Sequence, residues 1–296
     1  MRLLVVTQKV DKNDPVLGFF HGWLRAFSRH FEHITVIALG VGEYDLPGNV
    51  KVLSLGKETR SNLGTKLWRF YKYIWQERKN YQKVLVHMNQ EYVILGWKSW
   101  RFLGKEIYLW RNHAKGNLIT RLAVFLSKKV FYTSPKSYTA RFKKAVQMPV
   151  GIDTDFFKPG PDVQRIPNSI LFLGRISPVK RVLEFIEWFN TLDDKFTATI
   201  AGEALPRDKR YEAIVRGLAS SRVKFVGAVT QEQARRLYQT HEVYVNKTPA
   251  GSYDKTIFEA AASGMKLMVD NRDAQNIYVE DHSLEKLINK LKKELS

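Results

Sequence analysis

Two cations stand where an expected strand gives way to an expected helix. Residues 170–173 are apolar, Gly174 and Arg175 follow them, and Lys180 comes shortly before the helical spacing that begins near Val182. Backbone N–H groups at a helix start carry partial positive charge, and arginine and lysine side chains bind phosphate oxygens. The segment is therefore predicted to bind an anion such as a phosphate group.

A second segment combines a turn with carboxylates at another expected helix start. Gly251 and Ser252 predict the turn, Asp254 precedes the helix, and Glu259 falls about one and a half turns into it. A carboxylate in that position can accept hydrogen bonds from the two hydroxyl groups of a ribose. Either segment alone would also fit an ordinary solvent-exposed helix start. Their joint order and spacing favour a functional site.

The elements that would hold these residues are strands and helices in alternation. Short apolar runs, each predicted to be a buried parallel strand, are separated by segments with the spacing of a helix. This order predicts an α/β fold with parallel sheets. The expected strands are residues 3–7, 34–39, 50–55, 84–88, 107–111, 130–134, 170–174, 197–202, 223–227, 243–246 and 267–270.

A break in this alternation divides the chain into two halves of different charge. Residues 146–168 are rich in proline and glycine and suit a linker. Residues 1–150 carry 26 Lys and Arg against 9 Asp and Glu, a net charge of +17, whereas residues 151–296 carry 22 against 20, a net charge of +2. We predict two Rossmann-like domains facing a central cleft, residues 1–147 and 148–296, with a helix at 284–295 that is free to pack back on the first domain.

Composition and missing motifs exclude several classes of protein. The 296 residues are 44% hydrophobic and include no cysteine, which excludes a disordered chain, a disulfide framework and thiolate chemistry. Neither half has G-x-G-x-x-G or G-x-x-x-x-G-K-[ST] after its first strand, so we expect no standard dehydrogenase or P-loop enzyme. No apolar run is long enough for a signal peptide or a membrane span, and we therefore expect a cytoplasmic protein.

The motifs of the second half, taken in order, resemble those of glycosyltransferase family 4, whose members are retaining enzymes of the GT-B fold. The resemblance covers nearly the whole second half, whereas the first half matches more loosely, through Gly18, His87 and His113. The matching motifs of the second half are Gly151-Ile152-Asp153-Thr154-Asp155-Phe156-Phe157-Lys158-Pro159, Gly174-Arg175 with Lys180, Gly202, Phe225-Val226-Gly227, and Glu259-Ala260 through Gly264.

The resemblance implies a nucleotide-diphosphate sugar as donor, with the acceptor, a glycan or a lipid-linked molecule, in the first domain. Arg175 and Lys180 would hold the donor diphosphate and stabilise the leaving group, Glu259 would bind the ribose, and His113 would contact the transferred sugar. Together His113, Arg175 and Lys180 are the expected catalytic residues. The expected donor-binding residues are Gly18, Gly174, Arg175, Lys180, Gly202, Gly227, Gly251, Ser252, Asp254 and Glu259.

The resemblance also implies that no cofactor or bound metal is needed, because cations and helix termini stabilise the charge. Retention, which comes from the resemblance alone, would proceed by attack on the same face, with the leaving diphosphate accepting the acceptor's proton. The implied setting is the synthesis of cell-surface polysaccharide or glycolipid. His21 and His87 are weaker candidates, and burial among neighbours is the favoured interpretation for both.

One departure from the family pattern concerns a pair of glutamates eight positions apart. The position eight before Glu259 is Gly251, so the carboxylate that usually meets the sugar is absent. Asp254, or the amides of Gly251 and Ser252, would have to serve instead. The identity of the sugar therefore stays open.

The first half interleaves cations with aromatic residues between Lys57 and Lys83. An expected helix around residues 67–75 has an apolar face with cations elsewhere, the pattern of a helix in an anionic membrane interface. Packing of that face on the sheet is the alternative. We expect a peripheral membrane contact and no nucleic-acid partner, because the nearly neutral second half carries the phosphate motifs.

Three other functions remain open on the sequence. A nucleotide-sugar epimerase of the same architecture would form its product without any acceptor. A basic nucleic-acid-binding protein would suit the cations and aromatic residues of the first half. The glycine at position 251 would be consistent with a relative that binds the donor but is inactive.

Overall fold

The chain folds into two compact units, each built on its own parallel sheet. The computed structural model describes residues 1–251, 253–274 and 278–296. The first unit comprises Met1–Pro149 and Leu287–Ser296, and the second comprises Val150–Lys286. Helix α9 (Leu284–Leu295) therefore begins in the second unit and ends in the first. In the described part of the chain, every helix is too short or too polar to cross a bilayer.

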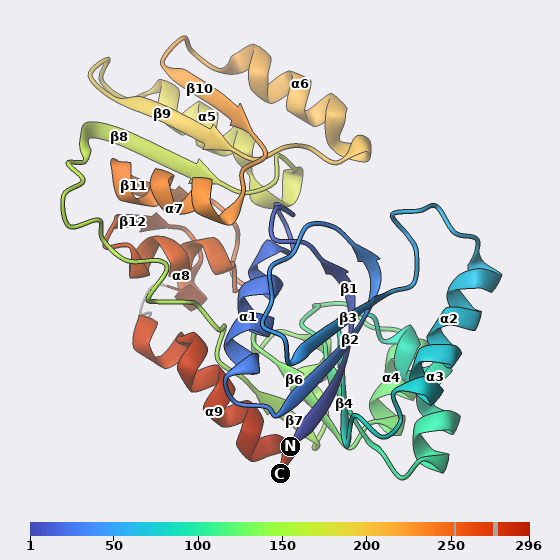
Figure 1. Ribbon diagram of the computed structural model, residues 1–296. Helices are drawn as coiled ribbons and strands as arrows, with labels where there is room; N and C mark the ends of the chain where they lie inside the picture. The colour runs from blue at the N-terminus through green and yellow to red at the C-terminus, as the bar shows by residue number, and fades with distance from the viewer. Residues whose placement is uncertain (252, 275–277) are drawn as a thin grey trace. The chain divides into compact units, whose positions relative to one another are not determined.

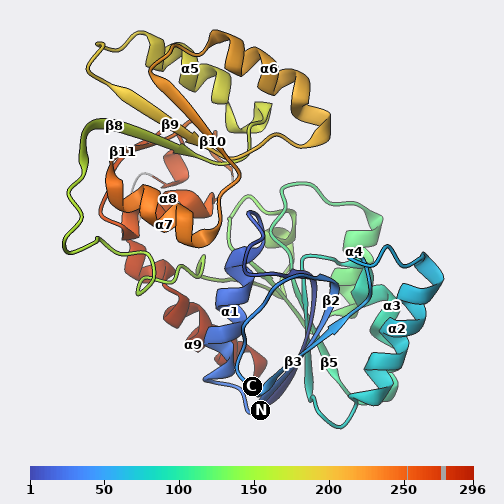
Figure 2. The same cartoon turned by 45° about the horizontal axis from the view of Figure 1, so that its top comes forward.

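The first unit contains a seven-stranded sheet in the order β3-β2-β1-β4-β5-β6-β7, with every pair parallel. Helices α2, α3 and α4 cover one face of this sheet, and α1 and α9 lie on the other (Figures 1 and 2). The strands are β1 (Arg2–Val10), β2 (His33–Val41), β3 (Val50–Ser54), β4 (Lys83–His87), β5 (Glu106–Trp110), β6 (Lys129–Tyr132) and β7 (Ala145–Gln147). The helices before α9 are α1 (Gly18–Ser28), α2 (Leu63–Gln76), α3 (Glu91–Phe102) and α4 (Leu118–Leu126).

The second unit contains a five-stranded parallel sheet in the order β10-β9-β8-β11-β12. Ile170 and Phe172 face one core with α5 and α6, whereas Leu171 faces another with α7 and α8, as the alternation of a strand requires. The strands are β8 (Ile166–Leu173), β9 (Thr197–Ala201), β10 (Val223–Gly227), β11 (His241–Asn246) and β12 (Lys266–Val269). The helices are α5 (Val182–Asn190), α6 (Lys209–Leu218), α7 (Gln231–Thr240) and α8 (Lys255–Ala262).

The expected strands are present, and two details differ from the prediction. Strand β7 (Ala145–Gln147) was missed because three residues give almost no periodic signal; it begins just before the expected linker at residues 146–168 and pairs with β6. Strands β10 and β12 are not buried as predicted, since Val226, Leu267 and Met268 are exposed. Both lie at the edges of their sheet, where one side of a strand has no neighbour.

Candidate active site

Three of the predicted glycines meet where strands β8, β9 and β10 end. Gly202 has a φ of +138°, and a Cβ atom built on it would lie 2.0 Å from the carbonyl oxygen of Gly174. The amide of Gly202 donates to the carbonyl of Gly227 at 2.7 Å, and the amide of Gly174 donates to that of Ala201 at 2.9 Å. Only a residue without a side chain permits this approach of two backbones.

Arg175 and Lys180 occupy the loop between β8 and α5. Lys180 ends a short 3-10 turn, Pro178–Lys180, and Arg181 has a φ of 51° before α5 begins at Val182. The Lys180 side chain folds back toward Gly174, since its Cδ and Cε atoms would lie 3.9 Å from a Cβ atom there. Arg175 is exposed to solvent. The two cations therefore flank the glycine where β8 ends.

Asp254 is the partner of Lys180. An ion pair joins Lys180 Nζ to Asp254 Oδ2, and the two side chains are only 17% and 11% exposed. Asn246, at the end of β11, donates from Nδ2 to the same carboxylate oxygen at 3.2 Å. Burial would raise the pKa of Asp254, but the charge and hydrogen bond of Lys180 outweigh burial and lower that pKa. Asp254 is thus ionised and holds the ammonium group of Lys180 in place.

Asn246 was missed in the sequence, although its position gives a usable signal. It is a buried polar residue at the carboxyl end of β11, a central strand of the sheet. Its Oδ1 accepts from the amide of Thr248 at 2.9 Å, so both ends of the amide side chain are engaged. Ligands of open α/β sheets lie beyond the carboxyl ends of the strands, which makes such a residue a candidate.

Glu259 lies inside the unit, on α8. The Tyr238 hydroxyl donates to Glu259 Oε2 at 3.0 Å. Burial raises the pKa of Glu259 and lowers the pKa of Lys255, one turn earlier on the same helix, and each charge partly offsets the effect of burial on the other. Lys255 Nζ also donates to the carbonyl of Gly151 at 3.4 Å. In this structure Glu259 contacts Tyr238, and its binding to a ribose stays a prediction.

Gly251 occupies the position where the family pattern has a glutamate. Its φ is +118°, a conformation that a residue with a side chain rarely adopts. Its amide donates to Asp273 Oδ2 at 2.8 Å. The local backbone therefore favours glycine here, and the Gly251 amide already has a partner, which weakens its case as a donor to the sugar. Ser252, predicted beside it, lies outside the described residues.

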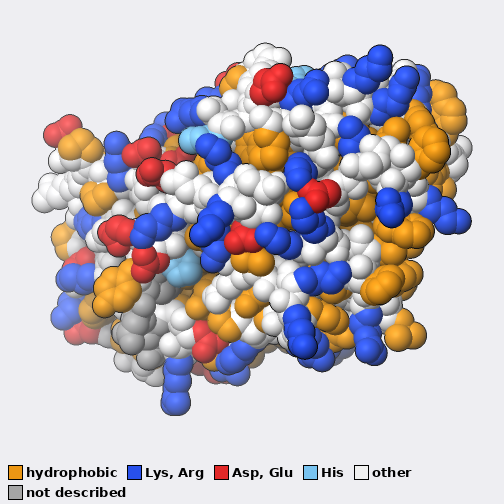
Figure 3. Space-filling view, turned by 90° about the horizontal axis from the view of Figure 1, so that it is seen from below, with side chains coloured by type: hydrophobic (Ala, Val, Ile, Leu, Met, Phe, Trp, Pro, Cys, Tyr) orange, Lys and Arg blue, Asp and Glu red, His pale blue; other side chains and the backbone are white. Residues whose placement is uncertain are grey.

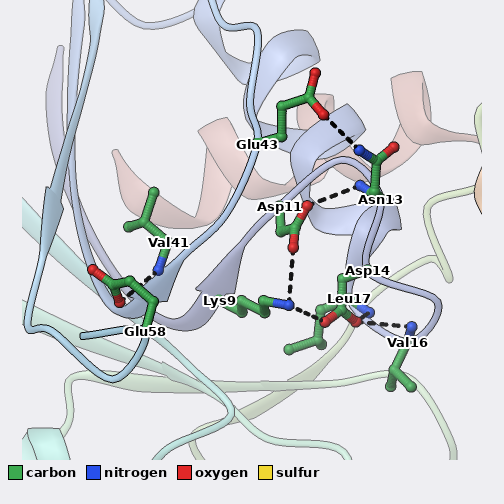
Figure 4. A network of polar contacts seen from close by, with 9 residues as sticks. All are labelled: Lys9, Asp11, Asn13, Asp14, Val16, Leu17, Val41, Glu43 and Glu58. Atoms are coloured by element: carbon green, nitrogen blue, oxygen red, sulfur yellow. Dashed lines mark hydrogen bonds and ion pairs between the residues drawn. The ribbon is translucent and has the colours of Figure 1, made fainter. Parts of the chain in front are cut away.

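Gly18 begins helix α1, after a loop that its own polar contacts hold in place (Figure 4). Lys9 Nζ lies 2.9 Å from an Asp11 carboxylate oxygen and 2.7 Å from one of Asp14. Asp14 Oδ1 accepts from the amides of Val16 and Leu17, and the Gly18 amide donates to the Asp14 carbonyl at 2.9 Å. Burial would raise the pKa of Asp14, but hydrogen bonds from Lys9 and the two amides lower it. These contacts within the loop support its shape.

His113 is exposed in the loop after β5. Its Nδ1 lies 3.0 Å from the amide nitrogen of Lys115 and 3.0 Å from the carbonyl oxygen of the same residue. His87, by contrast, is buried, stacks on Phe20 with ring centroids 4.1 Å apart, and contacts the Thr7 hydroxyl. His21 is also buried, and burial lowers its pKa. Of the three histidines, His113 is the one whose ring reaches solvent.

Comparison with known proteins finds a family model that matches part of the chain. Residues 167–291 match the family model described as glycosyl transferases group 1. This part of the chain is thus similar in sequence to the group 1 glycosyl transferases. The chain is accordingly a glycosyltransferase, as its motifs predicted. No curated protein sequence matches the chain.

Solved structures of low sequence identity share the GT-B fold of this glycosyltransferase. HepE of Anabaena, in complex with UDP and glucose, is 16% identical, with 99% of this chain and 89% of that chain covered and a TM-score of 0.73. The lipopolysaccharide outer core galactosyltransferase WaaB is 13% identical, with 100% and 90% covered and a TM-score of 0.62. An alpha-glucosyltransferase in complex with UDP-glucose and DNA containing an abasic site is 10% identical, with 100% and 88% covered and a TM-score of 0.67.

Within its second unit, the glycosyltransferase brings several of its predicted residues together. Gly174, Lys180, Gly202, Gly227 and Asp254 gather at the strand ends of the second unit. Gly18 and His113 belong to the first unit and are described there by themselves. Among the described residues, no group of three histidines and carboxylates is arranged to hold a metal ion. What this site offers chemically is two cations, Arg175 and Lys180, beside the glycine that follows β8.

Proposed function

We propose that the chain is a retaining glycosyltransferase of family 4 that moves a sugar from a nucleotide-diphosphate sugar to a glycan or lipid-linked acceptor. The observation that carries the proposal is the arrangement of Arg175 and Lys180 around Gly174, in a unit whose sequence matches the group 1 glycosyl transferases. A uridine donor is supported by HepE, whose structures contain UDP or UDP-glucose.

The cations would act on the leaving group. Arg175 is exposed and available to a diphosphate, whereas Lys180 is held by Asp254 until the more highly charged diphosphate competes for it. As the bond from the anomeric carbon to the diphosphate oxygen breaks, these cations stabilise the negative charge that develops. The acceptor oxygen bonds to the anomeric carbon on the same face, and its proton passes to the leaving diphosphate. This reaction requires no metal ion.

The acceptor is proposed to be a glycan or lipid-linked molecule at the cytoplasmic face of an anionic membrane. The first half of the chain carries a net charge of +17, which would attract phosphorylated glycans and anionic lipids. The similarity to WaaB, described as a lipopolysaccharide outer core enzyme, supports an acceptor in cell-surface polysaccharide or glycolipid synthesis.

A thermal-shift panel tests the donor site, because a ligand that binds the folded state raises its apparent stability. The panel contains UDP, GDP, ADP and their sugar conjugates. We expect a shift with one nucleotide that is lost in Arg175→Ala and Lys180→Ala and kept in Arg236→Ala, which removes an exposed helical cation elsewhere in the same unit. A nucleotide shift that all three variants retain would place the binding elsewhere.

Product analysis then tests the reaction. We expect the sugar to appear in an acceptor product with the anomeric configuration of the donor, measured by NMR, and to do so in the presence of a chelator. Inversion of configuration or loss of activity on chelation would contradict the proposed mechanism. Conversion of the donor in the absence of any acceptor would favour an epimerase.

DNA is a second candidate acceptor, favoured by the structure of the alpha-glucosyltransferase in complex with DNA and by the charge of the first half. We expect no transfer to DNA, because the first unit also exposes aliphatic side chains that nucleic acid would not cover. Transfer of labelled sugar to duplex DNA would reverse this choice. Salt-sensitive nucleic-acid binding with no donor binding at all would instead indicate a nucleic-acid-binding protein.

A further inference from the structure

Helix α4 exposes an apolar face to solvent. Leu118, Leu122 and Phe125 follow the i, i+4, i+7 spacing of one helix face and are 78%, 46% and 76% exposed. The opposite face, with Ala123 and Val124, is buried against the unit. Helix α4 therefore has two apolar faces, one that packs inside the unit and one that is exposed to solvent. We call Leu118, Leu122 and Phe125 the α4 stripe.

The neighbouring helices extend this apolar surface. Phe102, at the end of α3, is 80% exposed, and its ring lies 5.9 Å from that of Trp75 on α2. Trp68, also on α2, is exposed as well, with Lys72 Nζ 4.6 Å above its ring. Helices α2, α3 and α4 lie side by side on one face of the sheet (Figures 1 and 2). The space-filling view shows hydrophobic side chains with Lys and Arg among them along this side of the molecule (Figure 3).

The charged residues on these helices are almost all positive. The only carboxylate within the three helices is Glu91, at the start of α3. The cations within them are Lys66, Arg69, Lys72, Lys98, Arg101 and Arg121. An apolar face with cations around it is what an amphipathic helix presents to a bilayer whose headgroups are anionic.

Charge and side-chain type select among the partners that would cover this surface. A second copy of the chain would bring one basic surface against another, which repel. Nucleic acid would suit the cations and Trp68, but the α4 stripe contains aliphatic side chains, which offer a base no ring to stack on. An anionic bilayer satisfies both parts, since its acyl chains accept the apolar residues and its phosphates accept the cations.

We propose that the surface formed by α2, α3 and α4 lies in the interface of an anionic membrane, with the α4 stripe inserted at the boundary between headgroups and acyl chains. The proposal deepens the proposed function and rests on it only in naming a lipid-linked acceptor. The sequence pointed to α2 as the membrane helix, but Phe70 and Ile74 of that helix are fully buried against the sheet. The inserted residues are therefore on α4, and α2 contributes mainly its cations and tryptophans.

Vesicle sedimentation with apolar variants tests the insertion. Leu122→Gln/Phe125→Gln removes two exposed apolar side chains without adding charge. We expect binding to vesicles of phosphatidylglycerol and phosphatidylcholine to weaken about tenfold or more. The matched control is Ile214→Gln on α6, since Ile214 is 47% exposed and Leu122 is 46% exposed. Unchanged binding of the double variant, or equal weakening of the control, would overturn the proposal.

A charge variant and a fluorescence variant test the same surface independently. Lys98→Gln/Arg101→Gln/Arg121→Gln should weaken binding to anionic vesicles at low salt, by about fivefold per cation, and reduce its salt dependence. In Phe125→Trp, tryptophan emission should shift to shorter wavelength on addition of the anionic vesicles. An unshifted emission from a vesicle-bound protein would show that α4 stays in water and would overturn the insertion.

Three further measurements separate this proposal from the others. The thermal shift caused by the donor nucleotide should be the same in Leu122→Gln/Phe125→Gln as in the unchanged chain. Donor binding and membrane binding are therefore tested independently, and a failure of donor binding would leave the membrane proposal standing. Concentration-dependent dimerisation without lipid that this double variant abolishes would identify the surface as a self-interface. Nucleic-acid binding without vesicle binding would identify it as a nucleic-acid surface. Either result would overturn the membrane proposal.

Discussion

At the scale of single residues, the ion pair between Lys180 and Asp254 sets the charge of the candidate donor site. Two largely buried charges hold each other, and Asn246 adds a hydrogen bond to the carboxylate. Removing either partner leaves the other charge in a poorly solvated place, which is costly. The pair therefore contributes to stability as well as to the position of Lys180.

A double-mutant cycle measures this coupling. We expect Asp254→Ala to lower the free energy of unfolding by about 2 kcal/mol. The double variant Lys180→Ala/Asp254→Ala should lose less than the sum of the two single variants, by about 1 kcal/mol. Urea unfolding provides the values. Strict additivity would show that the two charges do not stabilise each other in solution.

At the scale of secondary-structure elements, the ends of β8 and β9 approach so closely that Gly202 admits no side chain. Gly202→Ala should therefore destabilise the second unit by about 3 kcal/mol and abolish the nucleotide shift. The matched control is Gly217→Ala in α6, where an added Cβ atom meets nothing within 4 Å. That change should stabilise the helix by up to about 1 kcal/mol. Equal thermal melting of the two variants would contradict the close approach.

A charge cluster lies where strands β4 and β5 begin, and it makes the folding stability of the first unit depend on pH in the acid range. Burial would raise the pKa of Glu106, but hydrogen bonds from Lys128 and Lys83 lower it from 4.5 to about 2. Because the folded-state pKa lies below the ordinary value, the ionised carboxylate stabilises the fold above pH 4.5, and this contribution is lost as the pH falls toward 2.

The variant Glu106→Gln tests this contribution to the stability of the fold. We expect the variant to be less stable than the unchanged chain at neutral pH and to lose less stability on acidification from pH 4.5 to about 2. Equilibrium unfolding in urea at a series of pH values, followed by circular dichroism, gives both slopes. Parallel slopes would mean that Glu106 is not held ionised by its two lysines.

At the scale of the whole molecule, periodicity was enough to predict the alternation of strands and helices, because buried parallel strands are continuous apolar runs. It could not predict which side of α4 faces the sheet, since Leu118, Leu122 and Phe125 have the same spacing as a buried face. Nor could it pair Lys180 with Asp254, which are distant in sequence and meet only when β8 and β11 pair. The family motifs located the candidate site, whereas its internal contacts required the fold.

The central claim is that a nucleotide diphosphate binds where the strands of the second unit end. Hydrogen–deuterium exchange measures this most directly, using the nucleotide that gives the largest thermal shift. We predict slower exchange of amides in residues 174–181, 202–204 and 253–259 when the nucleotide is bound, with no change in α2 and α3. Saturating nucleotide with slowed exchange confined to other segments, or with none at all, would contradict the account.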